Sequence, residues 1–331
     1  MERFALAAAV VLGFALTAAL CSLFVPLRRV LERREQQQQP VQSEQPRPAP
    51  LCAPLWGGLC AAAGTVAAVG VGWLAACVGQ PELLGSEGRL MTRLLTALAG
   101  SLAFGAVGLA EDLARMRSPA ALGLRRDVRL LLEALAAAFV LLLLRAAGCL
   151  PQGLGVPGAG YVLLGSAVPL LWAVLMVTLA ECARVAERDE GTVCGAAFAA
   201  MLALMMVEAG LGVSGLAVLP GALAGALVAL GLWAFPPAKL GAGCCGSLLA
   251  AGAIGCIPLS LDMTSLTVPL ALPFWAAGGL LAAQLLCAKR TGKPLRCWVK
   301  KHKMSPETVF LCSFALSAVG YVLALALLRW C

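Results

Sequence analysis

The segment FGAVGLAEDLARMRSPAALGLRRDVR, residues 104–129, joins an apolar stretch to an adjacent acidic pair and then to a run of arginines. The pair, Glu111 and Asp112, stands where the apolar stretch ends, so we expect both carboxylates at the membrane–water boundary. Two neighbouring carboxylates there can share Mg²⁺, which takes its other ligands from waters and substrate phosphates. The arginines can hold phosphate oxygens or anionic lipid headgroups; they are Arg115, Arg117, Arg125, Arg126 and Arg129.

A second interpretation of this segment needs no ligand. The acids would mark the stop of a helix, and the arginines would follow the positive-inside rule for membrane proteins. The residues of this segment alone do not decide between the two.

The composition is that of an integral membrane protein. Of 331 residues, 61% are hydrophobic and 13% are charged, and the mean hydropathy is +0.90, far from the balance of a soluble domain. The net charge of +8 does not indicate nucleic-acid binding, because the basic residues lie in short loops between apolar segments. The fourteen cysteines form no CxxC pair, and many lie inside apolar segments. We therefore expect small core residues rather than disulfides or zinc ligands.

Apolar segments of about 20 residues, the length that crosses a bilayer, recur along the whole chain. They are Phe4–Val25, Leu51–Val78, Met91–Leu109, Val128–Gly148, Tyr161–Ala180, Thr192–Leu211, Leu216–Phe235, Ser247–Leu261, Leu266–Cys287 and Val309–Leu328. The sequence thus predicts an all-α, polytopic membrane protein with about ten transmembrane helices in a single transmembrane domain, residues 1–331. Most of the 25 lysines and arginines fall in the inner loops if both termini are on the outer side, which predicts that orientation.

The first inner loop, residues 28–50, is rich in Gln, Pro and charged residues. It has too little apolar surface to fold alone, so we expect a flexible cytoplasmic connector.

A second acidic segment, AECARVAERDEG at residues 180–191, follows the fifth apolar segment. On a continued helix Glu187 and Glu190 would share a face, which permits a second pair of carboxylates directed at a metal. The same mixture of charges is also typical of a solvated helix end whose acids pair with their neighbouring arginines.

The other two inner loops suggest anion binding. A Gly-rich loop in WAFPPAKLGAGCCGSL, residues 233–248, precedes a helix start expected at Ser247, and its backbone N–H groups together with Lys239 could bind an anion. The last inner loop collects seven basic residues and His302. A lone histidine among lysines is more often a solvated residue than a catalytic base.

Two further carboxylates lie within apolar segments, where ionisable groups are often functional. Glu133 lies about one turn inside the fourth segment and could face a cavity beside the acidic pair. Glu208 lies near the outer end of the sixth, and we expect it to reach interfacial water in a structural role.

The order of these motifs resembles the phospho-N-acetylmuramoyl-pentapeptide transferase family and its relatives that move N-acetylhexosamine 1-phosphate onto polyprenyl phosphate (glycosyl transferase family 4). APLWGG at Ala53–Gly58 is similar to the family's TPTMGG, and GLAEDLARMR with the following LGLRRDVRLLLEALAA to its aspartate-pair segment. FPPAKLGAGCCGSL is similar to FPPAKIFMGDTGSL, and AECARVAERDEG stands where the family has its DGLDG loop. The resemblance extends from about Ala53 to Glu307.

The resemblance implies a multi-pass protein of the bacterial inner membrane that acts in peptidoglycan or surface-polysaccharide synthesis. A UDP-sugar would bind through Mg²⁺, a phosphate oxygen of polyprenyl phosphate would attack the sugar-bearing phosphorus, and UMP would leave. The resemblance gives Asp112, Glu111 and Glu187 catalytic roles, with Glu111, Asp112, Glu187 and Glu190 as metal ligands. It assigns substrate binding to Arg115, Arg125, Arg126, Lys239 and His302.

Several family positions are changed. Glu111 replaces the first aspartate of the pair, Cys244 replaces the metal-binding aspartate of the MGDTGS loop, and Pro50 replaces a lysine. Glu181 and Arg184 replace two asparagines, Glu187 and Glu190 replace the aspartates of the DGLDG loop, and His302 is all that stands near the family's histidine triplet. Cysteine is a poor ligand for Mg²⁺, which prefers hard oxygen donors.

Two functions follow from the resemblance and its departures. The chain is either a diverged phospho-sugar transferase or a catalytically inactive paralogue that binds polyprenyl phosphate or docks onto an active cell-wall enzyme. The partners expected in either case are membrane lipids and a second copy of the chain or that enzyme. A transporter or channel would need charged residues or broken helices near the bilayer midplane, so we rank that class last.

Overall fold

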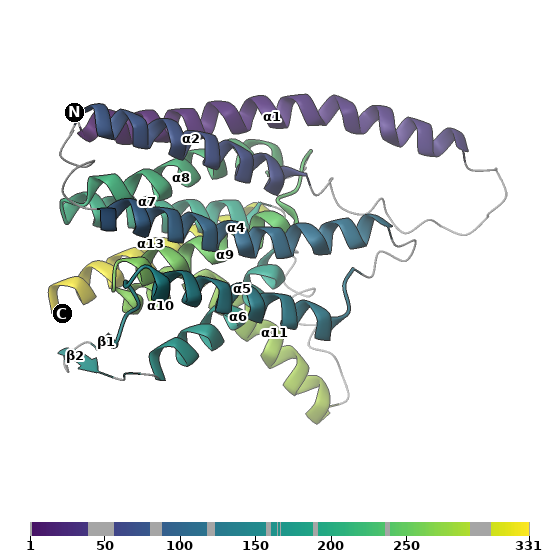
Figure 1. Ribbon diagram of the computed structural model, residues 1–331. Helices are drawn as coiled ribbons and strands as arrows, with labels where there is room; N and C mark the ends of the chain where they lie inside the picture. The colour runs from purple at the N-terminus through teal and green to yellow at the C-terminus, as the bar shows by residue number, and fades with distance from the viewer. Residues whose placement is uncertain are drawn as a thin grey trace.

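The protein is almost entirely helical (Figure 1). The computed structural model describes residues 2–38, 56–79, 88–117, 123–156, 160–163, 165, 167–187, 191–235, 239–291 and 306–330. The long helices are α1 (Glu2–Gln38), α2 (Gly57–Gly79), α4 (Gly88–Arg117), α5 (Arg126–Ala146), α6 (Ala167–Ala186), α7 (Thr192–Gly210), α8 (Ser214–Ala234), α9 (Gly243–Ser260), α11 (Leu272–Thr291) and α13 (Pro306–Trp330). The short elements are β1 (Gly153–Val156), β2 (Gly160–Leu163), the 3₁₀ turn η1 (Thr264–Leu266) and α10 (Thr267–Leu270).

The long helices form a bundle in which α9 is the central element. All 18 residues of α9 are buried, and α4, α6, α2 and α7 pack around it. Small side chains make this possible. A Cβ at Gly108 of α4 would collide with the backbone carbonyl of Cys244, and one at Gly252 of α9 would lie 3.1 Å from the Cα of Ser101. Such close approach between helices is typical of membrane bundles.

Within the described ranges, eight helices are long and apolar enough to cross a membrane, and the pair formed by η1–α10 and α11, bent by 63°, would make a ninth. The prediction of a polytopic membrane protein is thereby confirmed, whereas the count of ten is not. The fourth predicted segment, now α5, is not among the eight, and it carries Arg129, Glu133 and Arg145 within its 21 residues.

The start of α1 and the end of α13 lie at the same end of the bundle (Figure 1). This agrees with termini that share one side of the membrane; that this side is the outer one stays a prediction. The opposite end of the bundle, where α4 and α6 end and α5 and α9 begin, carries the acidic segments.

The structure corrects the predicted all-α fold at one place. Tyr161 does not open a helix but lies in β2, which pairs with β1 as an antiparallel hairpin, and α6 begins only at Ala167. Short apolar stretches such as GLGV and GYVL cannot be assigned to helix or strand by periodicity. The Tyr161 hydroxyl donates to both carboxylate oxygens of Asp262 at 3.2 Å, which fastens the hairpin to the turn after α9.

Three predicted boundaries are also wrong. α4 does not stop at the acidic pair but continues through Arg117, α9 begins at Gly243 rather than Ser247, and α1 continues through Gln38. The first part of the predicted flexible connector is therefore helical, while residues 39–50 lie outside the described residues. For α1 and α4 the error lies where the helix runs on into polar sequence, which a search for apolar segments does not detect. For α9 it lies in the Gly-rich start GCCG, which was assigned to the preceding loop.

Candidate functional site

Eight charged side chains gather at the end of the bundle opposite the termini, and we refer to them as the charged cluster. It contains the carboxylates Glu111, Asp112, Glu133, Glu181 and Glu187 and the guanidinium groups of Arg115, Arg129 and Arg184. They come from α4, from α5, from the end of α6 and from Glu187, which directly follows α6. The cluster thus brings together four residues that the sequence assigns to the site: Glu111, Asp112, Arg115 and Glu187.

Asp112 caps the amino terminus of α9. One of its carboxylate oxygens accepts the backbone N–H of Cys244 at 3.0 Å and the other accepts that of Cys245 at 2.9 Å. The first N–H groups of a helix have no partner within the helix, and the residue before α9, Ala242, has no side-chain oxygen to offer. A carboxylate at a helix amino terminus also interacts favourably with the helix dipole. Asp112, only 1% exposed, therefore holds α4 to α9.

Cys244 connects this cap to Glu187. The Cys244 thiol donates a hydrogen bond to Oε2 of Glu187 at 3.1 Å. The same oxygen lies 3.9 Å from the Arg115 guanidinium. Burial raises the pKa of the Glu187 carboxyl, although the Cys244 thiol and the Arg115 charge act against the shift. Sequence reasoning treated Cys244 only as a missing metal ligand and did not anticipate this contact.

Glu111 lies among three guanidinium groups. Its Oε1 accepts a hydrogen bond from Arg115 at 2.9 Å and lies 3.6 Å from Arg129 and 3.7 Å from Arg184. Its Oε2 is buried without a hydrogen-bond partner in the described part of the chain. Glu111 is thus neutralised by the protein itself.

Glu181 completes the pairing within the cluster. It accepts hydrogen bonds from Nε of Arg129 at 2.8 Å and from Arg184 at 2.6 Å. Glu133 is fully buried with an oxygen 4.0 Å from Nε of Arg129. It faces no cavity of the kind the sequence suggested, because its side chain is fully enclosed and neither oxygen has a hydrogen-bond partner among the described residues. The sequence showed Glu181 and Arg184 as changed family positions. The alternative interpretation of residues 180–191, a helix end whose acids pair with neighbouring arginines, agrees with this ion pair, and a spacing of three residues on a helix favours it.

The remaining predicted site residues lie outside the buried cluster or outside the described residues. Arg125 and Arg126 at the start of α5 are exposed, and so is Lys239 before α9. Glu190 and His302 fall within segments that the structure does not describe.

A magnesium ion does not fit the described side chains as they are arranged. No three His, Cys, Asp or Glu side chains among the described residues are placed to hold a metal ion. Both Asp112 oxygens accept backbone N–H groups, guanidinium groups surround Glu111, and Cys244 offers a soft sulfur in place of a hard oxygen. Magnesium binding stays a prediction, because its fourth expected ligand, Glu190, lies beyond the described ranges.

Glu208 does not reach interfacial water as predicted. It lies near the end of α7 but is only 1% exposed, and its Oε2 has no hydrogen-bond partner among the described residues. The prediction failed because position near a helix end does not reveal which face of the helix turns inward.

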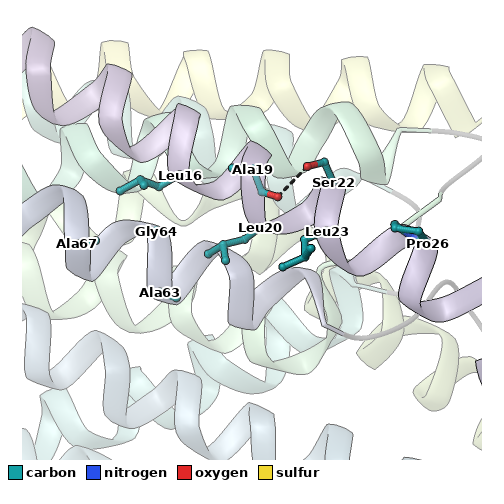
Figure 2. A pocket seen from close by; sticks show the side chains of 9 residues that line it. All are labelled: Leu16, Ala19, Leu20, Ser22, Leu23, Pro26, Ala63, Gly64 and Ala67. Carbon is teal, nitrogen blue, oxygen red and sulfur yellow. Dashed lines mark hydrogen bonds between the residues drawn. The ribbon is translucent and has the colours of Figure 1, made fainter.

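An apolar groove of about 480 Å³ lies between α1 and α2, and no residue of the charged cluster lines it (Figure 2). Aliphatic and small side chains line it, with Ser22 as the single hydroxyl: Leu16, Ala19, Leu20, Ser22, Leu23, Pro26, Ala63, Gly64 and Ala67. The Ser22 hydroxyl donates to the Ala19 carbonyl at 2.7 Å. The groove therefore offers an apolar surface suited to a hydrocarbon chain.

Comparison with known proteins adds one finding. Residues 94–262 match the sequence model of glycosyl transferase family 4, a stretch that runs from α4 to the turn after α9 and includes every described member of the charged cluster. No curated protein sequence matches the chain significantly.

Proposed function

Because the chain belongs to glycosyl transferase family 4, we propose that it binds polyprenyl phosphate in a bacterial inner membrane without transferring a phospho-sugar to it. In this proposal the chain is a catalytically inactive paralogue that acts beside the active enzymes of cell-wall or surface-polysaccharide synthesis. The observation that carries the proposal is the engagement of both Asp112 oxygens by the backbone of α9.

The charges of the cluster support the loss of catalysis. Transfer of a phosphoryl group depends on cations that neutralise the developing negative charge. Here each guanidinium group of the cluster lies within 4.0 Å of at least one carboxylate, so none is held in reserve for a diphosphate. The five carboxylates of the cluster outnumber its three guanidinium groups, so the cluster would repel a diphosphate.

Phosphate binding would use the basic residues outside the cluster. Arg125, Arg126 and Lys239 have exposed side chains at the same end of the bundle. Exposed guanidinium and ammonium groups at a membrane surface attract a lipid phosphate without any metal.

An active transferase is the second candidate, and one observation favours it. Glu187 and Asp112 are linked through Cys244, so two family site positions lie side by side. Release of Asp112 from α9 would free a carboxylate next to Glu187, and the pair would then be available to Mg²⁺, with Glu190 as a further ligand. Transfer from UDP-N-acetylhexosamine or UDP-muramoyl-pentapeptide would follow the chemistry that the family resemblance implies.

A transfer assay separates the two candidates. The purified chain in liposomes is given polyprenyl phosphate, Mg²⁺ and radiolabelled UDP-N-acetylhexosamine or UDP-muramoyl-pentapeptide. The label that becomes attached to lipid is then counted. We expect no product, together with saturable binding of polyprenyl phosphate that weakens when Arg125 and Arg126 are both changed to Gln. Product formation that is lost in Asp112→Asn would overturn the proposal in favour of the active transferase. Absence of both product and binding would reject both candidates.

A further inference from the structure

The helices α1 and α2 pack against each other as an antiparallel pair with very close backbones. A Cβ at Gly64 would collide with the Thr17 hydroxyl and would lie 3.1 Å from the Thr17 backbone nitrogen. Towards the charged end of the bundle, the ring of Phe24 stacks on that of Trp56, with centroids 5.7 Å apart and an interplanar angle of 12°. These two contacts, at Thr17 and at Phe24 of α1, fix how the residues between them are aligned with those of α2.

Between the two contacts, this alignment places one cysteine of α1 opposite one cysteine of α2. Cys21 follows Thr17 by four residues, and Cys60 precedes Gly64 by four, so both lie on the facing sides of the two helices. Their thiols lie close enough to interact, and both side chains are buried in one cluster. Facing cysteines on closely packed backbones are the arrangement from which a disulfide can form, and the two cysteines are free thiols in this structure.

From this juxtaposition we propose that Cys21 and Cys60 form a reversible disulfide that ties α1 to α2. Two S–H bonds break and one S–S bond forms, and the two protons and two electrons pass to a quinone dissolved in the bilayer, which becomes a hydroquinone. The lipid phase is the expected source of the oxidant, because the thiols lie in apolar surroundings from which charged oxidants are excluded. The apolar groove opens between the same two helices, and Leu20 and Ala63 line it close to the cysteines in sequence (Figure 2).

A third thiol makes the proposed pairing a specific claim. Cys194 of α7 belongs to the same buried cluster as Cys21 and Cys60. The register of α1 and α2, rather than mere proximity in the core, predicts that Cys21 bonds to Cys60 and not to Cys194.

The test uses the full-length chain in liposomes that contain a fully substituted benzoquinone. After thiols are blocked in denaturant, peptides are mapped by mass spectrometry, and hydroquinone is measured by its absorbance. We expect a Cys21–Cys60 linkage at about tenfold the yield of any other cysteine pair, because sulfurs that do not face each other cannot be bridged without backbone movement. Hydroquinone should form in proportion to that linkage, and added thiol reductant should reverse it.

Matched variants guard against indirect effects. Cys21→Ala and Cys60→Ala should each abolish quinone-dependent linkage, whereas Cys77→Ala, which removes another buried cysteine of α2, should leave it intact. A wild-type map with no Cys21–Cys60 linkage, or with Cys21–Cys194 as the main product, would overturn the proposal. The wild-type map decides this even if a variant fails to fold.

Discussion

Two antiparallel helix pairs in this protein are built alike along most of their length and differ at their ends. In α4–α9 and in α1–α2 a glycine lets the backbones touch, at Gly108 against Cys244 and at Gly64 against Thr17. The first pair then ends in a carboxylate that binds backbone N–H groups, and the second in stacked aromatic rings. The first lies in the centre of the bundle, whereas a groove opens along the second. In both pairs, glycine contacts set the distance between the two helices. The pairs differ in the contact at the charged end, which is a polar cap in α4–α9 and an apolar ring stack in α1–α2.

The largest effect is expected when the polar end contact is removed. Asp112→Ala leaves two buried N–H groups without an acceptor and should cost about 2–4 kcal/mol of stability, since a hydrogen bond to a charged group contributes about 1.5–3 kcal/mol. Thermal unfolding in detergent measures it. Asp127→Ala, which removes an exposed carboxylate in the first turn of α5, is the control. Equal stability losses in the two variants would contradict the capping role of Asp112.

The glycine contact of the peripheral pair should come next. Gly64→Ala forces α1 and α2 apart and should cost about 1–3 kcal/mol, the usual range for overpacking. Gly70→Ala on the same helix has open space around the new methyl group and should be neutral or stabilising by up to about 1 kcal/mol, the helix propensity difference. Thermal unfolding of both variants in detergent gives the comparison. Equal changes of stability in the two variants would contradict the close backbone packing of α1 on α2 at Gly64.

Pairing inside the charged cluster should have a smaller effect. Glu181→Gln removes the charge that Arg129 and Arg184 share. Because Glu181 and Arg184 are partly exposed, we expect a loss of about 1–2 kcal/mol, between the values for surface and buried ion pairs. Thermal unfolding of the variant and the wild type at low and high salt tests this. Salt screens the ion pairs of the wild type, so the difference in stability between the two proteins should be smaller at high salt. No loss at low salt would show that the network does not stabilise the fold.

The smallest effect is expected in how the stability of the fold depends on pH through the Glu187 carboxyl. Its pKa is raised in the folded protein by burial, so the protonated form is favoured there relative to the unfolded chain. The stability that this provides is present below the ordinary pKa of glutamate and is lost as pH rises through the raised folded value. Glu187→Gln should therefore flatten the stability–pH curve over that window while leaving the curve at lower pH unchanged. A steeper curve in the variant would contradict the assigned direction.

The sequence predicted the apolar half of this architecture better than the polar half. Segments such as Thr192–Leu211 and Leu216–Phe235 nearly coincide with α7 and α8, because a run of apolar residues has few stable alternatives in a membrane. Two boundaries failed where a helix enters polar sequence, as α4 does beyond Glu111.

Four of the eight members of the charged cluster were predicted as site residues, but the hydrogen bonds that join Asp112 to α9 were not. That these residues form a functional site stays a prediction. The acidic pair and Glu187 were identified from charge and from family resemblance, and the structure brings them together. The cap that Asp112 provides to α9 joins residues more than a hundred positions apart, so no local pattern could predict it. The hairpin at Tyr161 was missed because four-residue apolar strands share the composition of helix ends.

The length of α1 has a separate consequence. Its membrane-spanning part ends at Pro26, yet the helix continues through Gln38 and extends past its neighbours in Figure 1. At 1.5 Å per residue this extension is a rod of about 18 Å. The helix therefore projects from this end of the bundle as a rod of fixed length, which gives the protein a stand-off on the side of the charged cluster.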